Sequence, residues 1–339
     1  MSYSNACVAL AVLGWSSMLP SGSFAQKVIK FATLAPEGST WMKVLGELNA
    51  ELVEKSGGKL RFKIYAGGVS GDEKDVVKKM RIGQIHAAGF TGVGIGEVAP
   101  RLRILDAPWL FNTAAEVEAV RQRFDKEFIQ ALADAGYVLL GWTDLGSVYV
   151  FSKTPFKGPE DMKKAKMWVW EGDPIAEAAY KAMGLSPVPL SVVDVLSSLQ
   201  TGLIDAVYGP PMGVIALQWH SRTKHIYAVP MAEASGAVLL SRRFFDALAP
   251  EERKVLLEVS SKHLKRLLEM TRKENAAALE TLVKKQGLVL SEKPSPETMK
   301  LYRELGTKAR KELAGRLYPA DLLARVEKSL EDLRKKKAD

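Results

Sequence analysis

The chain has 339 residues, of which 47% are hydrophobic and 26% are charged, and its formal net charge is +9. These proportions are typical of a globular protein, and the length predicts roughly two domains. Basic residues are interleaved with acids and form no stripe with aromatic residues, so the sequence predicts no nucleic-acid binding.

Residues 1–25 carry no charged side chain and predict a secretory signal peptide. The apolar run 6–13 has the length of a signal core, and Ser23-Phe24-Ala25 predicts cleavage before Gln26. No run reaches the roughly 20 apolar residues that a transmembrane helix needs. Cys7, the one cysteine, lies in this segment, so we expect a periplasmic protein whose mature chain has no disulfide and no metal site built on sulfur.

Strands alternate with helices along the rest of the chain, which predicts an α/β architecture. We expect strands at 27–33, 60–65, 84–90, 137–142, 147–152, 167–170, 187–190, 203–208, 225–230, 236–241 and 288–290. We expect helices at 40–55, 72–82, 114–135, 174–183, 191–202, 212–222, 250–285, 296–313 and 319–336. The glycine-rich segment 92–96 has Glu97 where a phosphate-binding G-x-G-x-x-G loop needs a different residue, so it predicts a flexible turn.

Residues 166–174, KMWVWEGDP, place two indoles at the end of a short strand. Side chains alternate along a strand, so Trp168 and Trp170 are expected on the same face. Asp173 is a good N-cap and Pro174 a good first residue for the helix that follows. Ligands of open α/β sheets usually bind where strands end, so the two tryptophans predict an apolar wall of a binding site.

The order of motifs resembles the extracytoplasmic solute-binding proteins of TRAP transporters, the DctP-like family. The matching segments are FATLAPEGS at 31–39, EKSGG at 54–58, IYAG at 64–67, GQI at 83–85, APWLF at 107–111, PED at 159–161, GLSPVP at 184–189 and LQTGLID at 199–205. The resemblance implies a two-lobed periplasmic-binding-protein fold, type II-like, with a long helix spanning both lobes. It also implies a small-molecule solute and delivery to the membrane permease subunits of a TRAP transporter.

In the fold that the resemblance implies, each lobe is built from two separate stretches of the sequence. Lobe I is expected to comprise residues 26–148 plus about 236–275, and lobe II residues 149–235 plus about 276–339. The long helix 250–285 is shared between them. The resemblance does not specify whether the protein is a monomer or a homodimer.

Three positions depart from the family pattern, and they change the expected ligand. Trp168 stands where the family usually has an arginine that pairs with a ligand carboxylate. Gly209, after Tyr208, stands where an asparagine is usual, and Ser147 stands where a second basic residue is usual. An indole cannot neutralise a carboxylate, so the sequence predicts a solute that is not a typical organic acid.

The candidate ligand-binding residues are Trp168, Trp170, Tyr208, Gly209, Trp219, Phe90 and Ser147. Phe90, Trp219 and also Trp142 are explained more simply as core residues, Asp173 as an N-cap and Glu171 as a surface acid. An apolar or aromatic solute stacked on the indoles is the favoured ligand. A cationic amine in an aromatic cage is the alternative.

Other functions need features that this sequence lacks. His86, His220, His225 and His263 belong to no catalytic or metal-binding motif, so we expect no enzyme activity, no metal and no cofactor. A solute-binding protein of an ATP-driven importer is the nearest alternative. A receptor that presents its bound solute to another protein is a further one.

Overall fold

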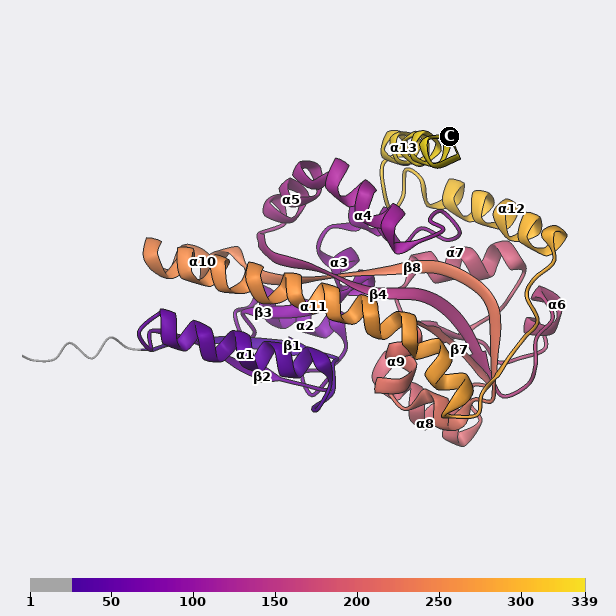
Figure 1. Ribbon diagram of the computed structural model, residues 1–339, viewed down its shortest axis with the longest axis horizontal. Helices are drawn as coiled ribbons and strands as arrows, with labels where there is room; N and C mark the ends of the chain where they lie inside the picture. Colours follow the sequence, from indigo (N-terminus) through magenta and orange to yellow (C-terminus); the bar gives the residue numbers. More distant parts are fainter. Residues whose placement is uncertain (1–25, 339) are drawn as a thin grey trace, which may run out of the picture.

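The computed structural model describes residues 26–338, so the predicted signal peptide lies outside the described residues. The fold is α/β, with one large mixed sheet and helices on both sides of it (Figure 1). Neighbouring strands of this sheet follow the order β2-β1-β3-β8-β4-β7, and β9 pairs with β8. A second sheet contains β5 and β6. Within residues 26–338, every helix is too short or too polar to span a bilayer.

The strands are β1 (Lys27–Thr33), β2 (Leu60–Tyr65), β3 (Ala87–Thr91), β4 (Tyr137–Ser152), β5 (Trp168–Trp170), β6 (Val188–Leu190), β7 (Ala206–Gly209), β8 (His225–Ser241) and β9 (Val289–Leu290). The helices are α1 (Thr40–Lys55), α2 (Glu73–Arg81), α3 (Gly92–Val98), α4 (Ala114–Arg123), α5 (Asp125–Asp134), α6 (Pro159–Met162), α7 (Pro174–Met183), α8 (Val195–Thr201), α9 (Pro211–Ala216), α10 (Arg242–Asp246), α11 (Pro250–Lys284), α12 (Pro296–Leu313) and α13 (Ala320–Ala338). Short 3₁₀ helices are η1 (Pro100–Asp106), η2 (Val192–Asp194) and η3 (Trp219–Arg222).

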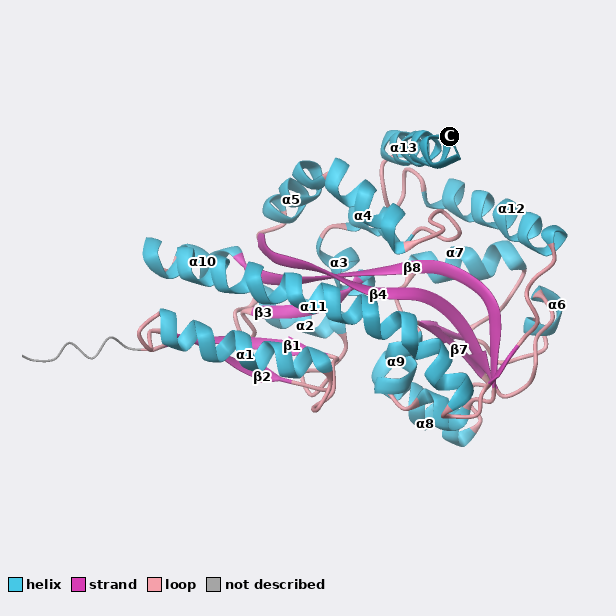
Figure 2. Ribbon diagram, viewed as in Figure 1, coloured by secondary structure: helices cyan, strands magenta, loops and turns pink. Residues whose placement is uncertain are grey.

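Two long strands join the lobes, where the sequence predicted four short ones. β4 and β8 each run without interruption and pair antiparallel along most of their length (Figure 2). The prediction was wrong because polar residues in the middle of each strand resemble a loop. The pairing register shifts between Asp144 and Gly146 and again between Val148 and Val150, and such bulges bend a strand without ending it.

The glycine-rich segment is a helix and not the predicted turn. α3 begins after Thr91, whose hydroxyl oxygen accepts a hydrogen bond from the Val93 N–H at 3.1 Å. Its glycines serve close packing: a Cβ on Gly92 would lie 1.7 Å from Asp106 Oδ2. The predicted helix 114–135 is likewise two helices, α4 and α5, which meet at Phe124.

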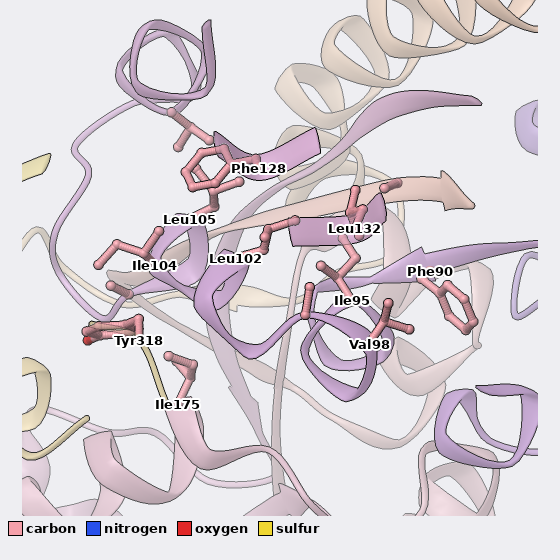
Figure 3. Packing of buried hydrophobic residues seen from close by; sticks show 14 of the residues in the cluster. Phe90, Ile95, Val98, Leu102, Ile104, Leu105, Phe128, Leu132, Ile175 and Tyr318 are labelled. Atoms are coloured by element: carbon pink, nitrogen blue, oxygen red, sulfur yellow. The ribbon is translucent and has the colours of Figure 1, made fainter. Parts of the chain in front are cut away.

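Buried apolar residues form four clusters in the part of the chain that the structure describes, and at least one of them draws on both predicted lobes. Figure 3 shows the core beneath α3, η1 and α5, where Ile95, Leu102 and Phe128 pack with Tyr318, which lies between α12 and α13. Ile175, at the start of α7, belongs to this same core and anchors that helix.

The predicted long helix is confirmed as α11, and it lies across both lobes (Figure 1). Its first half packs on β1, β2 and α1 through Leu256, Val259 and Leu264. Its last turn reaches a different core, where Leu282 packs among the tryptophans of β5 and η3. The exact lobe boundaries given above stay a prediction.

Asp72, just before α2 in lobe I, bonds to three groups of lobe II. Its carboxylate accepts from Trp170 Nε1 at 3.0 and 3.1 Å, from Ser191 Oγ at 2.5 Å and from the Val192 N–H at 3.1 Å. Asp72 is 3% exposed, so these hydrogen bonds lie inside the protein. They hold the two lobes together across the space between β3 and β5.

We predict that Leu256→Ala lowers the free energy of unfolding by about 2–5 kcal/mol, because Leu256 is 0% exposed and its loss leaves a cavity under α11. The neighbouring Leu257 is 38% exposed, and Leu257→Ala is expected to stay within about 0.5 kcal/mol of the wild type. Urea unfolding followed by circular dichroism measures both. Equal losses in the two variants would contradict the described packing of α11.

We predict that Asp72→Ala lowers the free energy of unfolding by about 2–3 kcal/mol, because buried donors on Trp170, Ser191 and Val192 lose their acceptor. Asp75→Ala, which removes an exposed partner of Lys78 from the same helix, serves as the control and is expected to cost about 1 kcal/mol or less. Urea unfolding followed by tryptophan fluorescence provides the comparison. An Asp72 variant as stable as the control would show that the contact between the lobes contributes nothing.

Candidate ligand-binding site

A cavity of about 260 Å³ lies between the lobes. Lobe I contributes residues from β1, β3 and η1, lobe II contributes β5, α7, β7 and α9, and α11 closes one side. β4 and β8 cross the cavity through residues 144–148 and 231–234. Its volume is near the lower end of the roughly 300–1,000 Å³ usual for small-molecule sites, so it fits a small metabolite.

Aromatic side chains form one wall of the cavity. The ring of Trp168 stacks on Tyr208, with centroids 4.9 Å apart and planes at 25°, and meets Trp219 edge-on at 5.3 Å. Trp168 and Trp170 lie stacked at 6.2 Å, so the expectation that they share a face is confirmed. Trp168 is 1% exposed and its Nε1 donates to the Leu190 carbonyl at 3.0 Å, which fixes the ring in the wall.

Six of the seven candidate residues line the cavity. They are Phe90, Trp168, Trp170, Tyr208, Gly209 and Trp219. Phe90 and Trp219 serve the core as well, being 2% and 4% exposed. Ser147 is not among the lining residues, because its hydroxyl turns to Glu233 Oε1 and donates to it at 2.5 Å. Contact of these residues with a solute stays a prediction.

Asp173 does more than cap α7. Its Oδ1 accepts from the Ile175 N–H at 3.1 Å, as predicted for an N-cap, and also from Arg103 Nη2 at 2.7 Å. Its Oδ2 accepts from the Tyr208 hydroxyl at 2.8 Å. Asp106 Oδ2 lies 3.3 Å from Arg103 Nε on the other side. Burial opposes the charged form of Arg103, but Asp173 and Asp106 together raise its pKa above the usual value.

Glu73, the first residue of α2, also lines the cavity and is held by three donors. It accepts hydrogen bonds at 2.7 Å from the Thr91 N–H, the Thr91 hydroxyl and the Gly94 N–H. Burial nevertheless raises the pKa of Glu73 to about 7, and burial also raises that of Asp106 to about 6. The carboxyls on this side of the cavity therefore carry less negative charge near neutral pH than exposed ones would.

Several lining residues were not found by reasoning from the sequence. They include Trp41 on α1 and Tyr180 on α7. Arg103 and Asp106 follow a three-residue spacing in η1 that signals a local ion pair and does not indicate a cavity. Glu233 was missed because its segment was predicted to be a loop between two strands, whereas β8 continues through it.

The histidines take part in structural contacts away from the site. None of the four is among the described residues that line the cavity. His86 Nδ1 lies 3.2 Å from the Lys30 amide nitrogen, and its ring stacks on Phe244. In the part of the chain that the structure describes, no group of three His, Cys, Asp or Glu side chains is placed to hold a metal ion.

Comparisons with known proteins agree with the motif order. A family model, bacterial extracellular solute-binding protein family 7 (DctP), matches residues 31–314. A solute-binding protein of Verminephrobacter eiseniae is 26% identical over 62% of this chain and 63% of its own length, so the match spans just under two thirds of that protein. The C4-dicarboxylate-binding periplasmic protein DctP of Rhodobacter capsulatus is 23% identical over 79% of this chain and 80% of its own.

The fold is also found among solved structures. A TRAP periplasmic solute-binding protein from Polaromonas sp. JS666, bound to D-erythronate, superimposes with a TM-score of 0.80 at 19% identity. The match covers 89% of this chain and 98% of that one. Since the family model spans most of the chain and the two-lobed fold matches, this protein belongs to family 7 of the bacterial extracellular solute-binding proteins, the DctP family.

Proposed function

We propose that this protein is a periplasmic receptor that binds a small solute between its lobes and delivers it to a TRAP-type permease driven by an ion gradient. Family membership and the shared fold support this role. The observation that carries it is the cavity, which is enclosed by both lobes and by α11. A solute held there stabilises the closed arrangement to the extent that it binds this arrangement more tightly than the open one.

The solute that this cavity favours has an apolar or aromatic body. Arg103 is the one basic side chain among the described residues that line the cavity, and its guanidinium is already bound between Asp173 and Asp106. A solute carboxylate would therefore enter without a free cation to neutralise it, and burial of an unpaired charge is costly. Tyr208, which is backed by Trp168, and Trp41 line the cavity and are partly exposed, so they instead offer apolar rings to a solute.

Two of the proteins compared above are described with carboxylate ligands. The Rhodobacter capsulatus protein is named for C4-dicarboxylates, and the Polaromonas structure holds D-erythronate. At 23% and 19% identity their pockets need not be the same as this one. We propose that this chain keeps the receptor fold of its relatives and differs from them in the chemistry of its solute.

We expect thermal unfolding to separate the two kinds of solute. Indole and tryptophol (the neutral indole ethanol) are expected to raise the melting temperature of the purified protein, because binding to the folded state alone adds about 2.7 kcal/mol at a hundredfold excess over Kd. Succinate and D-erythronate at equal concentration are expected to leave it unchanged. Stabilisation by the acids and not by the indoles would overturn the proposed ligand chemistry while leaving the receptor role intact.

The transporter class is tested by uptake. Cells that express this protein with a two-subunit TRAP permease are expected to accumulate the stabilising solute, and an ionophore that collapses the ion gradient should abolish uptake. A strain with the permease but without this protein is the control. Uptake that survives the ionophore and stops when ATP is depleted would assign the protein to an ATP-driven importer.

A further inference from the structure

Polar groups of the cavity wall differ in whether the protein already pairs them. Trp168 Nε1 donates to Leu190, Trp170 Nε1 to Asp72, and the Tyr208 hydroxyl to Asp173. The Tyr180 hydroxyl is buried, has no partner among the described residues and can donate or accept. The hydroxyls of Thr33 and Ser39 accept from backbone N–H groups and keep a proton to donate, so the charge that the wall favours depends on its carboxylates.

Glu233 is a buried carboxylate of the cavity wall that has no basic partner among the described residues. It lies on β8 where the strand crosses the cavity, and the residue is 6% exposed. Ser147 donates to its Oε1 at 2.5 Å, whereas its Oε2 has no hydrogen-bond partner among the described residues. Within residues 26–338, no Lys, Arg or His nitrogen lies in ion-pair range of this carboxylate.

Three aspartates of the cavity wall are paired with arginines of the protein itself. Asp144 accepts from Arg121 at 2.9 Å and from Arg272 at 2.6 Å, and Asp173 and Asp106 share Arg103. Burial raises the pKa of Glu233, and the negative charges of Asp144 and Glu116 raise it further. Glu233 is thus a buried acid whose neighbours repel its charge and do not neutralise it.

Two acceptors on α11 face the same cavity without partners. Glu274 Oε2 and Asn275 Oδ1 are buried atoms with no hydrogen bond among the described residues, although Thr40 donates to the other oxygen of Glu274. They lie on α11, whereas Glu233 lies on β8. The unpaired oxygen of Glu274 is therefore an independent sign that the occupant of the cavity carries a hydrogen-bond donor, whereas the amide of Asn275 can meet a donor or an acceptor.

We propose that Glu233 anchors a positively charged nitrogen of the solute, and that the apolar body of that solute lies against the aromatic wall at Tyr208. This inference rests on the proposed function, since it names the class of solute that the receptor takes. An ammonium group supplies the counter-charge and the donor that Glu233 lacks.

The test compares three probes that share one indole body: tryptamine, which is cationic, tryptophol, which is neutral, and indole-3-acetate, which is anionic. Isothermal titration calorimetry measures the affinity of each probe for the full protein and for two variants. Glu233→Gln keeps the shape of the side chain and removes its charge. Glu171→Gln removes an exposed acid that pairs with Lys74 outside the cavity, and it controls for the overall change in net charge.

For the wild type we expect tryptamine to bind at least about tenfold more tightly than tryptophol, with indole-3-acetate weakest. Glu233→Gln is expected to remove the advantage of tryptamine and leave tryptophol unchanged, while Glu171→Gln leaves the order and the ratios unchanged. Because the unliganded Glu233→Gln protein loses a repelled buried charge, its melting temperature should not fall. If the wild type shows no preference for tryptamine, the inference is overturned even if that variant fails to fold.

Two other outcomes overturn the inference in different ways. If tryptophol or indole-3-acetate binds the wild type as tightly as tryptamine, the aromatic site stands and the role of Glu233 is wrong. If no indole binds while D-erythronate or succinate does, the proposed ligand chemistry fails as a whole and the inference fails with it.

Discussion

The cavity depends on how the buried charge of Arg103 is balanced. A guanidinium that is only 4% exposed is costly to hold unless carboxylates surround it, and here Asp106 comes from the same 3₁₀ helix and Asp173 from the opposite lobe. The Tyr208 hydroxyl completes the arrangement by binding the second oxygen of Asp173. The same contacts link the lobes and pair the one basic side chain among the described residues that line the cavity.

The site is built on the segments that connect the lobes. β4 and β8 pass through the cavity, and their register shifts near residues 144–150 lie beside Leu145 and Val148, which line it. α11 spans the lobes on one side, and Asp72 closes the gap on another. The walls of the cavity are therefore the same parts of the chain that link the lobes. On the proposed function, a solute bound there acts directly on the distance between the lobes.

Specificity within this fold is carried by a few side chains in an otherwise shared frame. Where relatives are named for carboxylates, this chain presents a wall of stacked rings and a group of acceptors. Trp168 contributes both to the wall and to the packing of lobe II, since its ring meets Trp219 and its nitrogen is bound to Leu190. Such a residue cannot change without repacking, so the chemistry of this wall is tied to the core beneath it.

The sequence by itself determined the α/β class, the long helix, the family and the paired indoles at the end of β5, because periodicity, caps and motif order are local properties of the chain. It could not show that β4 and β8 run unbroken, since a bulge resembles a loop when the partner strand is unknown. It could not show that Arg103 forms an ion pair with Asp173, because Asp173 is distant in sequence. Nor could it show that Glu233 has no basic partner, because that depends on which distant segments pack around it. Tertiary structure decided the charge balance of the cavity, since burial and pairing exist only once those segments meet.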